Sequence, residues 1–204
     1  MYFDSLMKAI LTPSSMSVRP KACGPVRRNS AKATVEIHRL VQAVIKDGME
    51  EIEQCTWVDR AVTSVQKVLV QPDPVLWGIC EEDLPQARAA AELIELFDLK
   101  SDHASSVLLW LATYMRGRRL DAEAESFAER TIAMLEALSA PNEPKLANAL
   151  NVLGLINCDR GQYAVAEGLF VRAIALDETV YGSEQPALAT LLNSLSTVMA
   201  ASSR

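Results

Sequence analysis

Apolar residues recur at helical spacing along most of the chain. Between residues 34 and 48 they follow the period of a helix that buries one face, and Gly48 is a plausible stop. The same period returns over residues 51–70 and 73–99, where Pro85 must kink or divide the second helix. Residues 12–34 hold three prolines and several small polar residues, the composition of a linker. We therefore predict a disordered leader over residues 1–33 and a helical linking region over residues 34–100.

A repeat begins near residue 103. A shift of 42 residues superposes these identical pairs: Leu111 and Leu153, Ala124 and Ala166, Glu125 and Glu167, Arg130 and Arg172, Ile132 and Ile174, Glu136 and Glu178, Pro144 and Pro186. A further shift places Leu153 on Leu195 and Asn151 on Asn193, so the units are 103–144, 145–186 and a partial 187–200. This period in a helical sequence predicts stacked helical hairpins. The expected fold class is all-α, with an α–α superhelix of antiparallel hairpins over residues 101–200.

The second unit places small and aromatic residues at positions that packing explains. We expect Gly154 to let the neighbouring helix approach closely, and Gly161 to supply the turn between the two helices. The other members of the pattern are two aromatic residues that fill space and two alanines that make the small contacts of a helix crossing: Tyr163, Phe170, Ala166 and Ala173. This stretch is interpreted as packing rather than chemistry.

The stretch "LGLINCDRGQYAVAEGLFVRAI", residues 153–174, resembles the tetratricopeptide repeat, in the long variety found in kinesin light chains. The resemblance is strongest over residues 145–186, weaker over 103–144 and partial over 187–200. It implies a non-enzymatic scaffold that binds proteins or peptides. The first unit departs at its turn, where Gly117 comes early and Leu120 is one residue out of step with Tyr163, so the angle of that hairpin is left open.

Two upstream segments carry a second resemblance. "VEIHRLVQAVIKD" and "WGICEEDLPQARAAAELI" are similar to the end of the winged-helix part and to the linking helices of STAND-type NTPases with an NB-ARC module. The alternative function that this implies is a sensor fragment of a larger ATPase receptor. The chain itself has no G-x-x-x-x-G-K-[ST] loop to hold nucleotide phosphates, so we expect no NTP hydrolysis by this chain alone.

Charge and composition narrow the partners. The net charge is −6, and the basic residues of the first 35 positions leave the remainder distinctly acidic, which disfavours nucleic acid as a partner. No apolar run approaches the roughly eighteen residues that span a bilayer, so no membrane partner is expected. Four cysteines lie far apart without a C-x-x-C pair, which indicates reduced cytoplasmic thiols and no metal site: Cys23, Cys55, Cys80 and Cys158.

Catalytic chemistry is not expected. His38 and His103 have neither a cysteine nor paired carboxylates at ligand spacing, and we predict that His38 is a packing or helix-start residue. The acidic clusters on the helices are interpreted as solvated faces, although a hydrolase using such carboxylates is the third alternative. We expect no cofactor and no metal. Trp57 and Trp77 are predicted to be core anchors, and Trp110 to belong to the repeat core.

The first helix of each hairpin is expected to line the concave surface of the stack. The candidate peptide-binding residues on it are Asn148, Asn151, Leu155 and Cys158, the corresponding Ser106, Leu109, Thr113 and Arg116 of the preceding unit, and Thr190, Asn193 and Thr197 of the following one. Asparagine side chains both donate and accept, so they suit the backbone of an extended peptide; solvating the groove or capping turns is the alternative. We also predict self-association through the open C-terminal end, where the third unit lacks its second helix.

Overall fold

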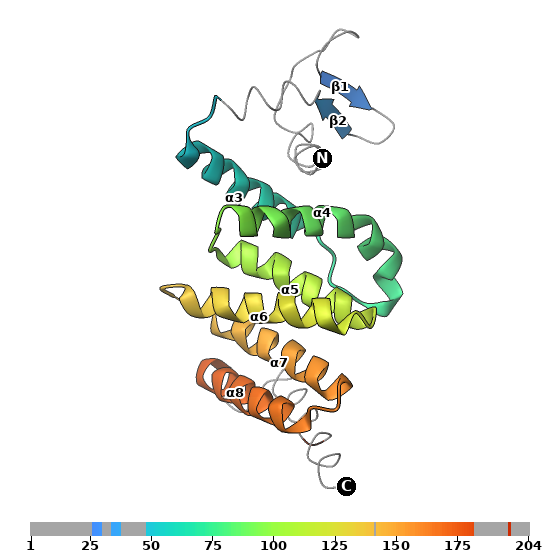
Figure 1. Ribbon diagram of the computed structural model, residues 1–204, viewed down its shortest axis with the longest axis vertical. Coiled ribbons are helices and arrows are strands. Elements are labelled where there is room, and N and C mark those ends of the chain that lie inside the picture. Colours follow the sequence, from blue (N-terminus) through green and yellow to red (C-terminus); the bar gives the residue numbers. More distant parts are fainter. Residues whose placement is uncertain (1–25, 30–33, 38–47, 141, 182–195, 197–204) are drawn as a thin grey trace. The chain divides into compact units, whose positions relative to one another are not determined.

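The computed structural model describes residues 26–29, 34–37, 48–140, 142–181 and 196. The chain divides into two compact units, one of residues 1–71 and 75–99 and one of residues 72–74 and 100–204. Each unit is described by itself, with the element labels of Figure 1.

The first unit contains a short β-hairpin within the predicted leader. Strand β1 (Val26–Asn29) pairs antiparallel with β2 (Thr34–Ile37), and Val26 lies opposite Ile37. The prediction of disorder is therefore wrong for residues 26–29, and that of a helix is wrong for residues 34–37. Strand β2 has three β-branched residues among its four, which favours a strand, and pairing with β1 satisfies the backbone groups along one edge of each strand. The rest of the predicted leader, and the predicted helix over residues 38–47, lie outside the described residues.

Two long helices make the described core of this unit. Helix α3 (Glu51–Val68) packs against α4 (Trp77–Leu96), which follows the short helical turn η1 (Pro74–Leu76). Pro85 lies inside α4, so the helix is not divided. The buried face of α3 runs through Val58, Ala61, Val62 and Val65, and Trp57 just outside it is 44% exposed. Trp57 is therefore no core anchor; its ring instead lies under the Arg60 guanidinium, 5.1 Å from the ring centroid.

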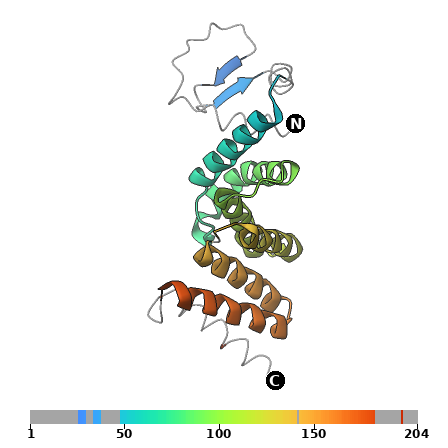
Figure 2. The ribbon, with the colours of Figure 1, turned by 90° about the vertical axis from the view of Figure 1, so that its left-hand side faces the viewer.

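The second unit consists of the two predicted helical hairpins. Helices α5 (Asp102–Gly117) and α6 (Asp121–Ala137) form the first, and α7 (Glu143–Asp159) and α8 (Tyr163–Tyr181) the second. Each helix packs on the next, and α5 also contacts α7 (Figures 1 and 2). Side-chain caps begin both first helices: Ser101 Oγ accepts from the Ala104 amide, and Asn142 Oδ1 from the Lys145 amide.

Packing in the second hairpin follows the prediction. Ala166, Phe170 and Ala173 are fully buried. A Cβ atom added at Gly154 would lie 2.6 Å from Phe170 Cε1, so the ring occupies the space that the glycine leaves. Trp110 is also buried, as predicted for the repeat core, and its ring stacks on Tyr114 at a centroid distance of 5.3 Å.

The two hairpin turns have the same backbone course despite their different sequences. In the first, the Leu120 amide donates to the Met115 carbonyl, and in the second the Gln162 amide donates to the Asn157 carbonyl, both 2.9 Å. Gly161 has φ +74°, and Arg119, 42 residues earlier, has φ +61°. The departure seen in the sequence at this turn thus leaves the hydrogen bonding unchanged, with arginine in a backbone region that favours glycine.

Candidate peptide-binding face

Eight predicted residues lie on the two contacting helices α5 and α7, and we call this set the first-helix face. It comprises Ser106, Leu109, Thr113 and Arg116 of α5 and Asn148, Asn151, Leu155 and Cys158 of α7. Spacings of three, four and three residues put each set on one side of its helix, and the two helices contact each other. Leu109 is buried, Asn148 is exposed and the others are half-buried. Asn193, Thr190 and Thr197 lie outside the described residues.

Asn151 stands out within this face because one of its polar atoms is unsatisfied. Its Oδ1 is buried and accepts no hydrogen bond from the part of the chain that the structure describes. Asn157 on the same helix behaves differently, because its Nδ2 donates to the Leu153 carbonyl at 2.8 Å. A buried acceptor without a donor costs free energy, so a ligand N–H at this position would be stabilising.

Arg116, the cation of the first-helix face, is held by an acidic neighbour. Its Nε lies 3.1 Å from Asp159 Oδ2, and Nη1 of Arg119 lies 3.3 Å from the other carboxylate oxygen. Burial raises the pKa of the adjacent Cys158 thiol and Asp159 raises it further, against a smaller lowering by Arg116. The Cys158 thiol therefore stays protonated at neutral pH and is a poor nucleophile.

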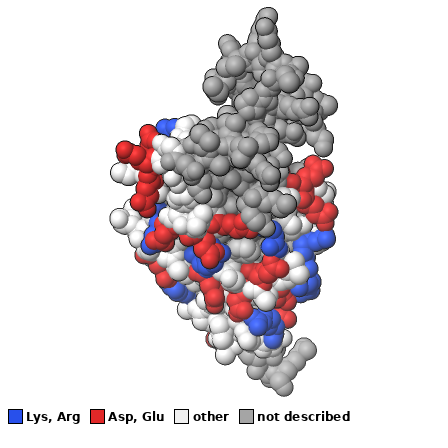
Figure 3. Space-filling model, turned by 45° about the horizontal axis from the view of Figure 1, so that its top comes forward, with Lys and Arg blue, Asp and Glu red and all other residues white. Residues whose placement is uncertain are grey.

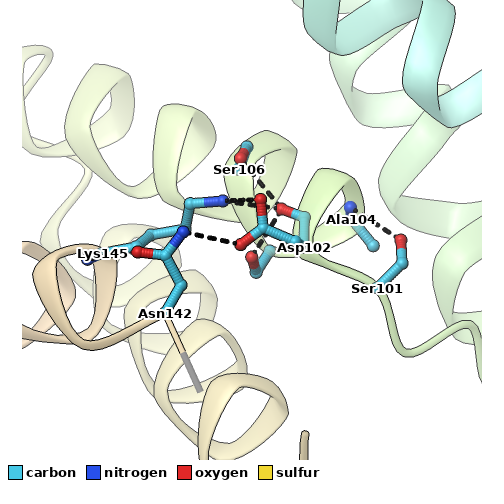
Figure 4. Close-up of polar contacts among 7 residues, drawn as sticks. Ser101, Asp102, Ala104, Ser106, Asn142 and Lys145 are labelled. Carbon is cyan, nitrogen blue, oxygen red and sulfur yellow. Dashed lines mark hydrogen bonds and ion pairs between the residues drawn. The ribbon is translucent and has the colours of Figure 1, made fainter. Parts of the chain in front are cut away.

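A second ionic contact joins α5 and α7 at their N-terminal ends (Figure 4). Lys145 Nζ lies 2.6 Å from Asp102 Oδ2 and donates to the Asp102 carbonyl at 2.8 Å, while Asn142 Nδ2 donates to Asp102 Oδ1 at 3.1 Å. With Arg116 and Asp159 at the opposite ends, this contact fixes the spacing of the two helices. Both pairs join opposite charges 43 residues apart, one more than the repeat period, so the alignment of identical residues did not predict them; a search for opposite charges near that period would find them.

Asp102→Asn is expected to reduce stability at neutral pH but not in acid. Burial would raise the pKa of Asp102, but the hydrogen bond and charge of Lys145, with Asn142 and His103, outweigh it and the pKa is lowered from 3.8. Such a carboxylate stabilises the fold above its unfolded-state pKa and loses that contribution as the pH falls through its folded-state pKa.

Urea unfolding of the wild type and Asp102→Asn tests this. The unfolding free energies should differ by roughly 0.5–1 kcal/mol at about pH 7, since the pair is partly exposed, and converge at about pH 2.5. Glu129→Gln, an exposed carboxylate on α6, is the control. A difference that persists in acid would assign the effect to the shape of the side chain instead of its charge.

Further ion pairs involve the second helices α6 and α8. Arg160 pairs with Glu125, and Arg172 on α8 pairs with Glu136 on α6. Figure 3 shows basic side chains interspersed with acidic ones on the face that it presents. These two ion pairs therefore join the first hairpin to the second.

The described residues show no grouping for metal chemistry or membrane insertion. Within the described ranges, no three His, Cys, Asp or Glu side chains gather as a metal site would require. None of the described helices is long and apolar enough to cross a membrane. His103 is exposed on α5, and His38 lies outside the described residues.

Comparisons with solved structures and with family models both give matches to this chain. A solved structure that is similar is the crystal structure of BtubC (BKLC) from P. vanneervenii, with 19% sequence identity, a TM-score of 0.48, and coverage of 78% of this chain and 68% of that chain. No curated protein sequence matches the chain. Residues 145–204 match the family model of the tetratricopeptide repeat, which confirms the resemblance stated for the second and third units.

Proposed function

We propose that this chain is a non-enzymatic interaction scaffold that binds an extended protein segment on its first-helix face. Tetratricopeptide repeats generally mediate protein–protein interaction, and residues 145–204 match that family. The observation that carries the proposal is the buried Oδ1 of Asn151, on the α7 row of this face, which accepts no hydrogen bond from the described residues. An extended peptide supplies backbone N–H donors at regular intervals, which is the chemistry that this atom lacks.

The hydroxyls of α5 strengthen this reading. Ser106 Oγ donates to the Asp102 carbonyl and Thr113 Oγ1 to the Leu109 carbonyl, both at 2.9 Å. Each hydroxyl has then used its hydrogen and keeps its acceptor lone pairs. Together with Asn151 Oδ1, they make a face that accepts hydrogen bonds, while Leu155 and the protonated Cys158 supply apolar contact. Peptide backbone N–H groups fit this surface better than an anionic ligand does.

The test is selection of binding peptides followed by substitution of the face. Peptides of about twelve residues, long enough to cross two helices in extended form, are selected from a random displayed library on the intact chain. Asn148→Ala combined with Asn151→Ala should weaken the selected peptides about tenfold, the effect of one or two lost hydrogen bonds. Titration calorimetry measures the affinity.

A matched control separates the face from general damage. Ser126→Ala combined with Glu129→Ala changes two exposed residues of α6 and should leave the affinity unchanged. If the asparagine variant folds and binds as tightly as the wild type while the α6 variant does not, the binding surface lies on the second helices and the proposal is wrong.

The other predictions about function, partners and location rest on the sequence alone. The NB-ARC alternative, a sensor fragment of a larger ATPase, rests on the upstream segments, which the family match at residues 145–204 does not include. A cytoplasmic location and the lack of nucleic-acid and membrane partners rest on composition. Self-association through the C-terminal end concerns residues beyond 181, outside the described range.

A further inference from the structure

The outer face of α8 differs in character from the same face of α6. Positions that correspond in the 42-residue repeat are exposed in both helices. On α6 they carry Ala122, Glu123, Ser126, Glu129 and Ala133, and on α8 they carry Ala164, Val165, Gly168, Val171 and Ala175. Every polar residue of the first set has an apolar counterpart in the second. We call the α8 set the α8 stripe.

The α8 stripe is not a surface for stacking the next hairpin. Helix α6 is packed against both α5 and α7, yet its corresponding positions remain exposed. Repeat packing therefore uses other sides of the second helices. Val165 is 55% and Val171 52% exposed, so a partner that covered both side chains would gain apolar burial.

The order of side-chain sizes along the stripe is self-complementary. Ala164, Gly168, Val171 and Ala175 lie at spacings of four, three and four residues, on one line down the helix. In an antiparallel pair of α8 helices related by a twofold axis, Gly168 meets Val171 of the second copy and Ala164 meets its Ala175. A Cβ atom added at Gly168 has nothing within 4 Å, so the site that would receive the valine is open.

Charge does not oppose this pairing. The line of four residues carries no charged side chain, and Arg172 at its edge is already paired with Glu136. We propose that the α8 stripe pairs two copies of this chain in an antiparallel, twofold-symmetric dimer. This inference does not rest on the proposed peptide-binding function, because it uses the second helices alone.

The length of the α8 stripe limits how tightly two copies can bind each other. From residue 164 to 175 the helix rises about 16 Å, and such a face buries on the order of 400 Å² per copy. This is about half of a standard interface, which indicates a weak dimer with a dissociation constant on the order of 100 μM.

Sedimentation equilibrium of the intact chain from about 10 μM to about 1 mM tests the dimer. The wild type should move from monomer to dimer. Val165→Glu combined with Val171→Glu installs the residues that α6 carries at these positions, so the fold should be kept, and it should raise the dissociation constant at least tenfold. Ser126→Glu combined with Ala133→Glu adds the same charge on α6 and should leave it unchanged.

Steric blocking provides a second readout. Gly168→Leu places a large side chain in the open site and should also raise the dissociation constant tenfold or more, with unchanged helical circular dichroism. A chain that stays monomeric at about 1 mM overturns the proposal. Dimerisation that persists in both the glutamate and the leucine variants also overturns it and assigns self-association to another surface, such as the predicted C-terminal end.

Discussion

Replacing Phe170 by alanine should lower the free energy of unfolding by about 3–5 kcal/mol, the largest loss expected from any single substitution discussed for this chain. The ring is completely buried between α7 and α8 and lies against the backbone of Gly154. Its removal takes away apolar burial and leaves a cavity, because the helices on either side are held by their other contacts. Urea unfolding followed by circular dichroism measures the loss.

The partner of the ring makes this prediction sharper. A Cβ atom at Gly154 would come within 2.6–3.0 Å of three atoms of the Phe170 ring. Gly154→Ala should therefore destabilise the chain by about 1–3 kcal/mol, although alanine is the better helix former. The first hairpin carries alanine at both corresponding positions, Ala112 and Ala128, and both are completely buried there. The second hairpin therefore uses a glycine and a large ring at the two positions where the first hairpin uses two alanines.

A double-mutant cycle exploits this exchange. In the Phe170→Ala background the clash is absent, so Gly154→Ala should be neutral or stabilising by up to about 1 kcal/mol, reproducing the pair of the first hairpin. Gly168→Ala is the matched control, because its added Cβ meets nothing within 4 Å. It should stabilise the wild type measured at low concentration. Equal losses from Gly154→Ala in both backgrounds would show that the ring does not determine the requirement for glycine.

The helical repeat could be predicted because residues that pack between helices recur every 42 positions in the sequence. Gly154 and Phe170 are predicted to pack and do pack in the structure, and Gly161 lies in the predicted turn with a positive φ. Helical periodicity likewise predicts which residues lie on one side of α5 and of α7, and the structure brings these two helices into contact. The repeat pattern does not predict what the first-helix face binds, because the pattern reflects contacts within the chain and binding depends on the chemistry of a ligand.

Three other features of the structure were not predicted, because the local pattern of apolar and polar residues does not determine them. Arg119 occupies the backbone region that favours glycine, since the hydrogen bonds of the turn and the packing of both helices impose it against local preference. The ionic contacts from Asp102 to Lys145 and from Arg116 to Asp159 fall one residue off the repeat period, where an alignment of identical residues shows nothing. Residues 34–37 have apolar spacing compatible with a helix, but pairing with residues 26–29 makes them a strand.

Replacing Pro85 by alanine should raise the free energy of unfolding by about 2 kcal/mol. Pro85 is exposed in the interior of α4, where it removes a backbone hydrogen bond and its ring presses on the carbonyl four residues earlier. Relief of these effects is worth up to about 3 kcal/mol, and the lost stiffness of proline in the unfolded chain subtracts roughly 0.4–1 kcal/mol. No packed side chain is altered.

The contacts made by the first half of α4 determine which measurement tests this prediction. Cys80 Sγ lies 3.9 Å from the Val70 carbonyl, and Val70 also hydrogen-bonds Asp83, so this half holds the segment that follows α3. If Pro85 bends α4 to make those contacts, straightening the helix breaks them.

Unfolding followed by tryptophan fluorescence in a Trp110→Phe background reports on Trp57 and Trp77 of this unit. Glu92→Ala, an exposed change on the same helix, is the control and should shift stability only slightly. A loss of stability in Pro85→Ala with no loss in Glu92→Ala would reverse the prediction and make the proline a positioning residue for Cys80 and Asp83.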